Sequence, residues 1–173
     1  MRRFAFLILT VLLGAAGVRA QDAHAADHGS IDAILAALYG TISGPEGQVR
    51  DTARFLDLFQ PGAQLCAMVK DSTGRPVVVY RQLRTFIAGV NRFIQAQGFF
   101  ETEVARRTET WGGLTHVWST YESRFQPDEA PFARGINSIQ LFHDGTRWWV
   151  VNITWTDEST GTPLPKRYLK GIR

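Results

Sequence analysis

Few side chains in this sequence combine a reactive type with a setting that favours catalysis. The sequence contains no phosphate-binding glycine loop, dinucleotide-binding fingerprint, serine nucleophile elbow or His-Glu-x-x-His zinc motif. Asp57 could act as a general base if the fold buried it and raised its pKa, but on a helix whose other side is apolar an aspartate more often faces solvent. Tyr121 could donate a hydrogen bond to a carbonyl oxygen, as an oxyanion stabiliser does, although a tyrosine in the core is the more common arrangement. The sequence therefore indicates no particular reaction.

Cysteine and histidine usage gives no sign of a metal, a cofactor or a disulfide. Cys66 is the only cysteine, so it cannot form a disulfide within the chain. Its apolar surroundings at residues 64–69 favour a buried strand thiol over a nucleophile. The four histidines are His24, His28, His116 and His143. A structured metal site needs convergent ligands, and these positions do not suggest one, so we expect no metal and no cofactor.

The first twenty residues have the layout of a secretory signal peptide. Arg2 and Arg3 precede an apolar run at residues 4–13, and Val18 and Ala20 occupy the positions that signal peptidase reads. An uncleaved anchor is the alternative, but the apolar run is shorter than the ~20 residues of a membrane span. We therefore expect cleavage after Ala20 and a secreted or periplasmic protein.

Removal of the signal peptide changes the charge of the protein. Three of the 19 Lys and Arg residues lie within residues 1–20, and none of the 16 Asp and Glu residues does, which leaves 16 basic and 16 acidic residues. A nucleic-acid-binding domain usually has a basic surplus. The balanced charge of the mature chain therefore argues against a nucleic-acid partner, and no later stretch is apolar enough for stable membrane insertion.

The order of periodic segments places helices first and long antiparallel strands afterwards, which is typical of an α+β fold. Apolar residues recur at helical spacing after the N-cap residue Ser30 and again from Leu83 to Gln97. The other expected elements are a short helix at residues 51–59 and strands at residues 64–69, 77–80, 99–111, 114–125, 133–143 and 146–158. The folded domain is expected to cover residues 30–158. A flexible leader at residues 21–29 precedes it, and a tail at residues 159–173 follows.

An Asp-Gly pair predicts a hairpin near the end of the domain. A two-residue loop at residues 144–145 would pair Asn137 with Asn152. A three-residue turn with a bulge at Gly145 is the alternative, and it would shift the pairing by one residue. With the two-residue loop, the outer face of the sheet carries Trp149, Val151, Ile153 and Trp155. Because a large exposed apolar patch usually marks an interface, we expect a homodimer through these residues.

A Gly-Gly pair at residues 112–113 predicts a second hairpin. A two-residue loop there pairs Val104 with Tyr121 on one face of the sheet. The opposite face then carries Glu101 paired with Arg124. This register predicts that Glu101 points away from the interior.

We expect the concave face of the sheet and the helices to form a pocket. The expected pocket-lining residues are Tyr39, Asp57, Val104, Tyr121, Asn137, Ile139, Trp148, Val150 and Asn152. Asn137 and Asn152 should lie opposite each other among apolar neighbours, where buried amides must be hydrogen-bonded. They could satisfy each other and the nearby backbone, or they could point polar groups at a ligand in a mainly apolar pocket.

Four segments of the mature chain resemble a known superfamily. They are ISGPEGQ (Ile42–Gln48), RFLDLFQPGAQL (Arg54–Leu65), HVWSTYESR (His116–Arg124) and RGINSIQLFHDGTRWWVV (Arg134–Val151). Together with the order of elements, they resemble the nuclear transport factor 2-like superfamily. This superfamily includes SnoaL-like cyclases and ketosteroid isomerases. The combination resembles in particular the secreted bacterial members without an assigned activity. The resemblance implies a cone-shaped α+β fold, in which N-terminal helices pack on a curved, mainly antiparallel sheet. It also implies a pocket between them and frequent dimerisation through the outer face of the sheet.

The resemblance implies no reaction, because the superfamily holds isomerases, dehydratases, cyclases and proteins that only bind. Its isomerases and cyclases use an acidic base deep in the pocket, and the expected concave strand faces carry no such carboxylate. We therefore expect an exported protein that binds a small apolar molecule. The alternatives are an isomerase or dehydratase that uses Asp57 or Tyr121, and an interaction module without a pocket.

Overall fold

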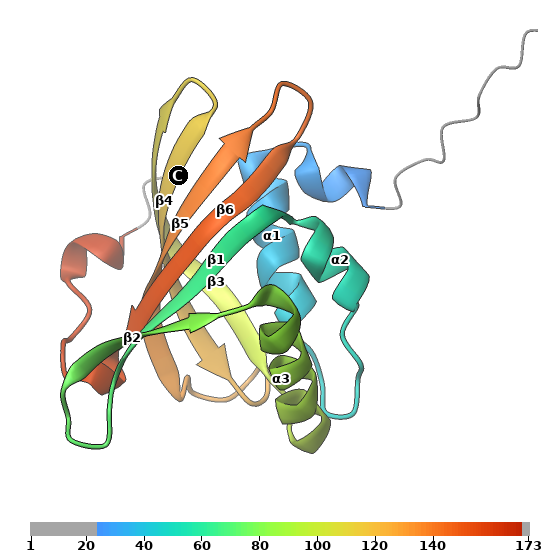
Figure 1. Ribbon diagram of the computed structural model, residues 1–173. Helices are drawn as coiled ribbons and strands as arrows, with labels where there is room; N and C mark the ends of the chain where they lie inside the picture. Colours follow the sequence, from blue (N-terminus) through green and yellow to red (C-terminus); the bar gives the residue numbers. More distant parts are fainter. Residues whose placement is uncertain (1–23, 171–173) are drawn as a thin grey trace, which may run out of the picture.

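The computed structural model describes residues 24–170, which form three α-helices and one six-stranded sheet. Figure 1 shows the helices packed on one side of the curved, open sheet. The α+β fold class expected from the sequence is confirmed. The predicted signal peptide at residues 1–20 and the first residues of the predicted leader lie outside the described residues. No helix within residues 24–170 has the length and apolar character needed to cross a membrane.

The elements follow the expected order, with helices ahead of most strands. They are η1 (Ala25–His28), α1 (Ile31–Ile42), α2 (Thr52–Asp57), β1 (Phe59–Lys70), β2 (Pro76–Arg81), α3 (Leu83–Ala96), β3 (Phe100–Trp111), β4 (Leu114–Arg124), β5 (Ala133–His143), β6 (Trp148–Asp157), η2 (Glu158–Thr160) and η3 (Lys166–Tyr168). The sheet has the strand order β2-β1-β6-β5-β4-β3. Every neighbouring pair is antiparallel except β1 with β6, which are parallel and bring the first and last strands together.

Side-chain caps fix the starts of α1 and α2. The Ser30 hydroxyl accepts a hydrogen bond from the Ala33 backbone N–H at 3.0 Å, and the Asp51 carboxylate accepts one from the Arg54 N–H at 2.9 Å. These bonds satisfy N–H groups that have no partner inside the helix. The helix N-cap predicted at Ser30 is therefore confirmed.

The hydrophobic core lies between the helices and the concave face of the sheet. Its fully buried side chains include Ile34, Leu35, Phe55, Leu58, Ile87, Val117, Ile139, Leu141 and Val150. Burying each such side chain contributes roughly 1.5–3 kcal/mol. The core therefore fixes the helices against the sheet and sets the walls of the space between them.

The β3–β4 hairpin keeps its predicted register only near the turn. The pairs from Trp111 with Leu114 to Ala105 with Thr120 follow the expected two-residue loop. The register then shifts, because Val104 is skipped in the pairing and forms a β-bulge.

Beyond this bulge the residues of β3 change face, because side chains alternate along a strand. Glu103 lies opposite Tyr121, and Glu101 lies opposite Ser123. Val104 itself is 43% exposed, so the expectation that it lines the pocket is wrong. The bulge also turns Glu101 toward the interior, so the expectation that Glu101 points away from the interior is wrong.

The turn between β5 and β6 is longer than either predicted form. His143 pairs with Trp148, so residues 144–147 connect the two strands. The Asp144 carboxylate accepts hydrogen bonds from the backbone N–H groups of Thr146 and Arg147 at 2.8 and 2.9 Å. Such aspartate-to-backbone bonds stabilise a turn of their own, and here they replace the predicted two-residue loop.

A second β-bulge lies on β6. Leu141 pairs with Val150 and Gln140 pairs with Asn152, so Val151 is skipped. Asn152 therefore does not pair with Asn137, as the sequence had suggested. Its amide nitrogen lies 3.3 Å from the backbone oxygen of Gln64 on β1.

The bulge on β6 turns two large side chains toward the helices. Ile153 is 7% exposed and belongs to the core, and Trp155 packs against that core. Asn137 lies opposite Trp155 in the β5–β6 ladder. The expectation that Ile153 and Trp155 share the outer face with Trp149 and Val151 is therefore wrong.

The fold extends beyond the predicted domain at both ends. His28 of η1 is 2% exposed, and its Nε2 lies 2.8 Å from a carboxylate oxygen of Asp57. At the other end, the backbone oxygen of Tyr168 accepts a 2.6 Å hydrogen bond from Thr120, and its ring lies 5.7 Å from that of Trp118. Figure 1 shows this C-terminal segment, in red, on the side of the sheet opposite the helices.

Candidate functional site

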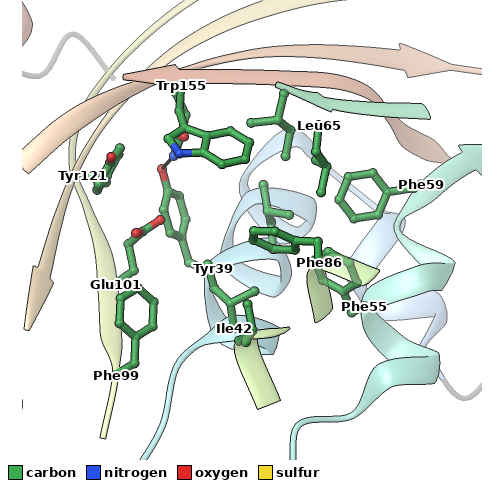
Figure 2. Close-up of a pocket in the computed structure, with 14 residues that line it drawn as sticks. Tyr39, Ile42, Phe55, Phe59, Leu65, Phe86, Phe99, Glu101, Tyr121 and Trp155 are labelled. Atoms are coloured by element: carbon green, nitrogen blue, oxygen red, sulfur yellow. Dashed lines mark hydrogen bonds between the residues drawn. The ribbon is translucent and has the colours of Figure 1, made fainter. Parts of the chain in front are cut away.

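A cavity of about 230 Å³ lies between the concave face of the sheet and the helices. Its apolar lining residues are Leu38, Ile42, Phe55, Phe59, Leu65, Phe86, Val90, Phe99, Ile153 and Trp155. Its polar lining residues are Tyr39, Glu101, Tyr121 and Asn137. Figure 2 shows Phe55, Phe59 and Phe86 toward one end, whereas Tyr39, Glu101 and Tyr121 gather toward the other. The cavity therefore has apolar walls and one polar end.

Glu101 is the only carboxylate among the residues that line this cavity. The Ser123 hydroxyl donates a hydrogen bond to it at 2.9 Å, and the Glu101 backbone N–H donates to Ser43 at 2.9 Å. Burial raises the pKa of Glu101 to about 7, although hydrogen bonds from Ser123 and Asn137 act in the opposite direction. Near neutral pH this carboxyl group can therefore both take up and release a proton.

Tyr39 connects the cavity to a buried hydrogen-bond network. Its hydroxyl oxygen lies 2.6 Å from Ser119 Oγ and accepts a hydrogen bond from Asn137 Nδ2 at 3.0 Å. Burial raises the pKa of the Tyr39 hydroxyl, and the nearby Glu101 adds to the effect. The phenol therefore stays protonated throughout the physiological pH range.

Tyr121 forms the adjacent part of the polar end and packs over a glycine. It lies opposite Gly135 on β5, where a Cβ atom would stand 2.5 Å from the Tyr121 hydroxyl oxygen. Burial is the largest cause of the raised pKa of Tyr121, followed by the charge of Glu101. Gly135 thus makes room for a neutral phenol beside the carboxyl group.

A chain of polar contacts continues from Ser119 to the surface. Ser119 donates to Glu103 Oε1, and the Arg106 guanidinium contacts Glu103 Oε2 through Nε at 2.9 Å and Nη2 at 2.8 Å. Arg106 Nη1 in turn lies 2.6 Å from Asp32, whose side chain is 87% exposed. The polar end of the cavity is therefore linked to solvent through fixed side chains.

The structure brings some of the expected pocket residues to the cavity and places others elsewhere. The structure places Tyr39, Tyr121 and Asn137 on the cavity wall. Ile139 and Val150 are fully buried in the core, and they are not among the lining residues of this cavity.

Two further expected pocket residues lie elsewhere. Trp148 packs against the hydrophobic core, and its ring lies 4.9 Å from that of His143. The amide nitrogen of Asn152 lies 3.9 Å from Cys66 Sγ, on the opposite side of the sheet from Ile153. The Val151 bulge is the physical reason for the position of Asn152, because it reverses the face of every later residue on β6.

Asp57 belongs to an ion cluster and is not among the cavity residues. Its Oδ2 lies 2.8 Å from His28 Nε2 and 3.2 Å from Arg147 Nη2. The Arg147 guanidinium also lies over the ring of Trp149, 3.7 Å from its centre. Burial acts to raise the pKa of Asp57, but the hydrogen bonds with His28 and Arg147 outweigh it and hold the pKa below its ordinary value. Asp57 is therefore an ion-pair partner of His28 and Arg147, and the expectation that it lines the pocket is wrong.

Glu101 is the cavity residue that the strand pattern of the sequence does not reveal. Strict alternation from the turn at residues 112–113 places it on the outer face, and the residues around Val104 carry no local sign of a bulge. A carboxylate on the concave face was therefore present but hidden. Within residues 24–170, no group of three or more His, Cys, Asp or Glu side chains could hold a metal ion.

Comparison with known proteins identifies the fold. No protein-family model matches the chain. No curated protein matches it either. An NTF-2-like protein of unknown function from Silicibacter pomeroyi is 14% identical, with 73% of this chain and 91% of that chain covered and a TM-score of 0.51.

Two other solved structures match over a similar part of the chain. A protein of unknown function with a cystatin-like fold from Nostoc punctiforme is 8% identical, with coverage of 73% and 87% and a TM-score of 0.54. The yeast UBP3-associated protein BRE5 is 11% identical, with coverage of 73% and 92% and a TM-score of 0.53. At such low identity these similarities concern the fold alone.

Proposed function

We propose that this chain, which has the nuclear transport factor 2-like fold, binds a small and mainly apolar molecule with one polar group. The observation that supports this is a cavity with apolar walls and one polar cluster, formed by Tyr39, Glu101, Tyr121 and Asn137. Apolar walls contribute affinity by removing ligand surface from water, and a few polar groups fix the orientation of the ligand. The same cavity argues against an interaction module with a filled interior.

Binding in the cavity can be tested by filling it with a larger side chain. Val90 lines the cavity, while Ala88 is exposed on the same helix. Val90→Trp should weaken the binding of the fluorescent apolar probe 1-aminoanthracene by about tenfold or more, and Ala88→Trp should bind like the wild type. If a folded Val90→Trp variant bound the probe as tightly as the wild type, the proposal would fail.

A second candidate is acid–base catalysis on the bound molecule, of the isomerase or dehydratase type. Glu101 favours it, because a carboxyl group with a pKa of about 7 lines the cavity beside Tyr121. In D2O, the wild type should exchange the α-hydrogens of 1-tetralone faster than Glu101→Gln does, as followed by proton NMR. Equal exchange rates would refute catalysis by Glu101 and leave the binding proposal standing.

Export and dimerisation remain predictions. The periplasmic protein should begin at Gln21, which N-terminal sequencing would check. The expected dimer face is smaller than the sequence suggested, because Ile153 and Trp155 line the cavity, and Trp149 and Val151 remain. Analytical ultracentrifugation should show a dimer for the wild type and a monomer for Trp149→Glu. A wild type that stays monomeric at high micromolar concentration would contradict the dimer.

A further inference from the structure

The directions of the hydrogen bonds behind the cavity follow from the Glu103 carboxylate, which can only accept hydrogen bonds. The Arg106 guanidinium binds it at Oε2, and the Ser119 hydroxyl donates a hydrogen bond to Oε1. A serine hydroxyl has a single proton to donate. At its second contact, 2.6 Å from the Tyr39 hydroxyl, Ser119 must therefore accept. It follows that Tyr39 donates to Ser119.

The direction of the next hydrogen bond, between Tyr39 and Asn137, is determined in the same way. The only hydroxyl proton of Tyr39 points to Ser119, so the 3.0 Å contact with Asn137 must be donated by the amide nitrogen. Every donor in this network thus points from the cavity toward Glu103. Tyr39, which lines the cavity, has a lone pair but no proton left for a ligand.

Building on the proposed binding function, we propose that Glu103, acting through Ser119, is a positioning residue that makes Tyr39 a hydrogen-bond acceptor toward the cavity. The site then selects a ligand with a hydroxyl group over the same ligand with a carbonyl group. A carbonyl oxygen beside Tyr39 would bring two acceptors together and leave a buried one unsatisfied, which is unfavourable.

Tyr121 strengthens this selection. Its hydroxyl group can rotate and can either donate or accept, and it lines the same end of the cavity as Tyr39. An alcohol can therefore donate to Tyr39 and accept from Tyr121. A ketone can accept from Tyr121 but has no proton to donate to Tyr39, so the difference between the two ligands arises at Tyr39.

Glu103→Gln, which replaces one carboxylate oxygen by an amide nitrogen, should reverse the direction of the hydrogen bonds that Ser119 makes. Arg106 only donates, so the amide oxygen of the new side chain stays at the position of Oε2, beside the guanidinium. The amide nitrogen then takes the position of Oε1 and donates to Ser119. A buried hydroxyl proton without a partner is unfavourable, so Ser119 should in turn donate its proton to Tyr39. The Tyr39 proton then becomes free for the cavity.

The test compares 1-tetralol with 1-tetralone, which share a bicyclic skeleton and differ in hydroxyl and carbonyl groups. By isothermal titration calorimetry, the wild type should bind 1-tetralol about fivefold more tightly than 1-tetralone, which is the effect of one net hydrogen bond. Glu103→Gln should shift this ratio toward 1-tetralone. Glu109→Gln, at an exposed glutamate on the same strand, should keep the wild-type ratio. In a Tyr39→Phe background, Glu103→Gln should leave the ratio unchanged, which a merely structural role of Glu103 would not predict.

The possible failures can be told apart. An unchanged ratio in Glu103→Gln, or the same change in the Tyr39→Phe background, would overturn the role of Glu103 and leave cavity binding intact. If the wild type bound neither compound, the proposed function would fail, and NMR without ligand would decide the direction of the network. The Tyr39 hydroxyl proton should then show a nuclear Overhauser effect to the β-protons of Ser119, which Glu103→Gln abolishes. If the Tyr39 hydroxyl proton of the wild type instead showed a nuclear Overhauser effect to the ring protons of Trp155, the inference would be overturned.

Discussion

Replacing the buried acid, as Glu101→Gln, should change how the stability of the protein depends on pH. Burial raises the pKa of Glu101 from the ordinary value of 4.5 to about 7. Each pKa unit corresponds to about 1.4 kcal/mol, so the shift corresponds to about 3 kcal/mol between the two protonation states. That amount is a large share of the total stability of a domain.

The sign of the effect follows from where the proton is held. Below pH 4.5 the carboxyl group of Glu101 is neutral in both the folded and the unfolded chain, and it carries no penalty. Between pH 4.5 and about pH 7 the folded chain keeps the proton while the unfolded chain loses it, so the free energy of unfolding falls as the pH rises. Above pH 7 the loss is complete and stays constant.

Urea unfolding of the mature protein at pH 4, 5, 6, 7 and 8 would measure this contribution. Glutamine has the shape of glutamate but no titration, so the stability of Glu101→Gln relative to the wild type should rise by about 3 kcal/mol from pH 4 to pH 8. Comparing the two proteins at each pH cancels the titration of the histidines and other carboxylates. Glu109→Gln, at an exposed glutamate on the same strand, is the matched control for this substitution. A constant difference for Glu101→Gln would refute the buried position of this carboxyl group.

Two further substitutions test neighbouring parts of the fold. Gly135→Ala should destabilise the protein by about 1–3 kcal/mol in urea unfolding, because its Cβ would stand 2.5 Å from the Tyr121 hydroxyl. Gly40→Ala, on a helix face with nothing within 4 Å, should instead stabilise it by about 0.5–1 kcal/mol, and the opposite order would contradict the packing. Asp57→Asn should destabilise the protein at pH 7 and progressively less below pH 4. The reason is that the pKa of Asp57 is lowered by its partners, Arg147 among them, so its contribution is present above the unfolded pKa and is lost as the pH falls. A loss that did not depend on pH would contradict the ion pair.

The elements that rest on local signals could be predicted from the sequence. The N-cap at Ser30 and the helical spacing that follows it are properties of neighbouring residues. The Gly-Gly turn at residues 112–113 fixes the pairing as far as Ala105 with Thr120. The order of helices and strands is enough for the α+β class. Each of these depends on contacts within about one turn or one hairpin, where propensity and turn chemistry decide.

The strand faces that could not be predicted depend on a single inserted residue in each of two strands. A β-bulge reverses the face of every later residue, so one error at Val104 moves Glu101 from the outside to the cavity. The same happens at Val151 for Ile153 and Trp155. The alternation of side chains along a strand does not reveal such an insertion, because a valine suits a regular strand and a bulge equally well. The faces were therefore wrong where the registers shifted.

The two bulges act on the same site from different strands. The bulge at Val104 brings Glu101 to the cavity, and the bulge at Val151 brings Trp155 to it, opposite Asn137. A regular β3 would leave the cavity without an acid, and a regular β6 would leave it without its indole wall. The apolar area of Trp155 also cannot serve an outer interface while it lines the interior. Part of the hydrophobic stabilisation that the sequence assigned to a dimer therefore stabilises the single chain. There the Trp155 side chain helps to enclose the polar end of the cavity, against which a ligand would be oriented.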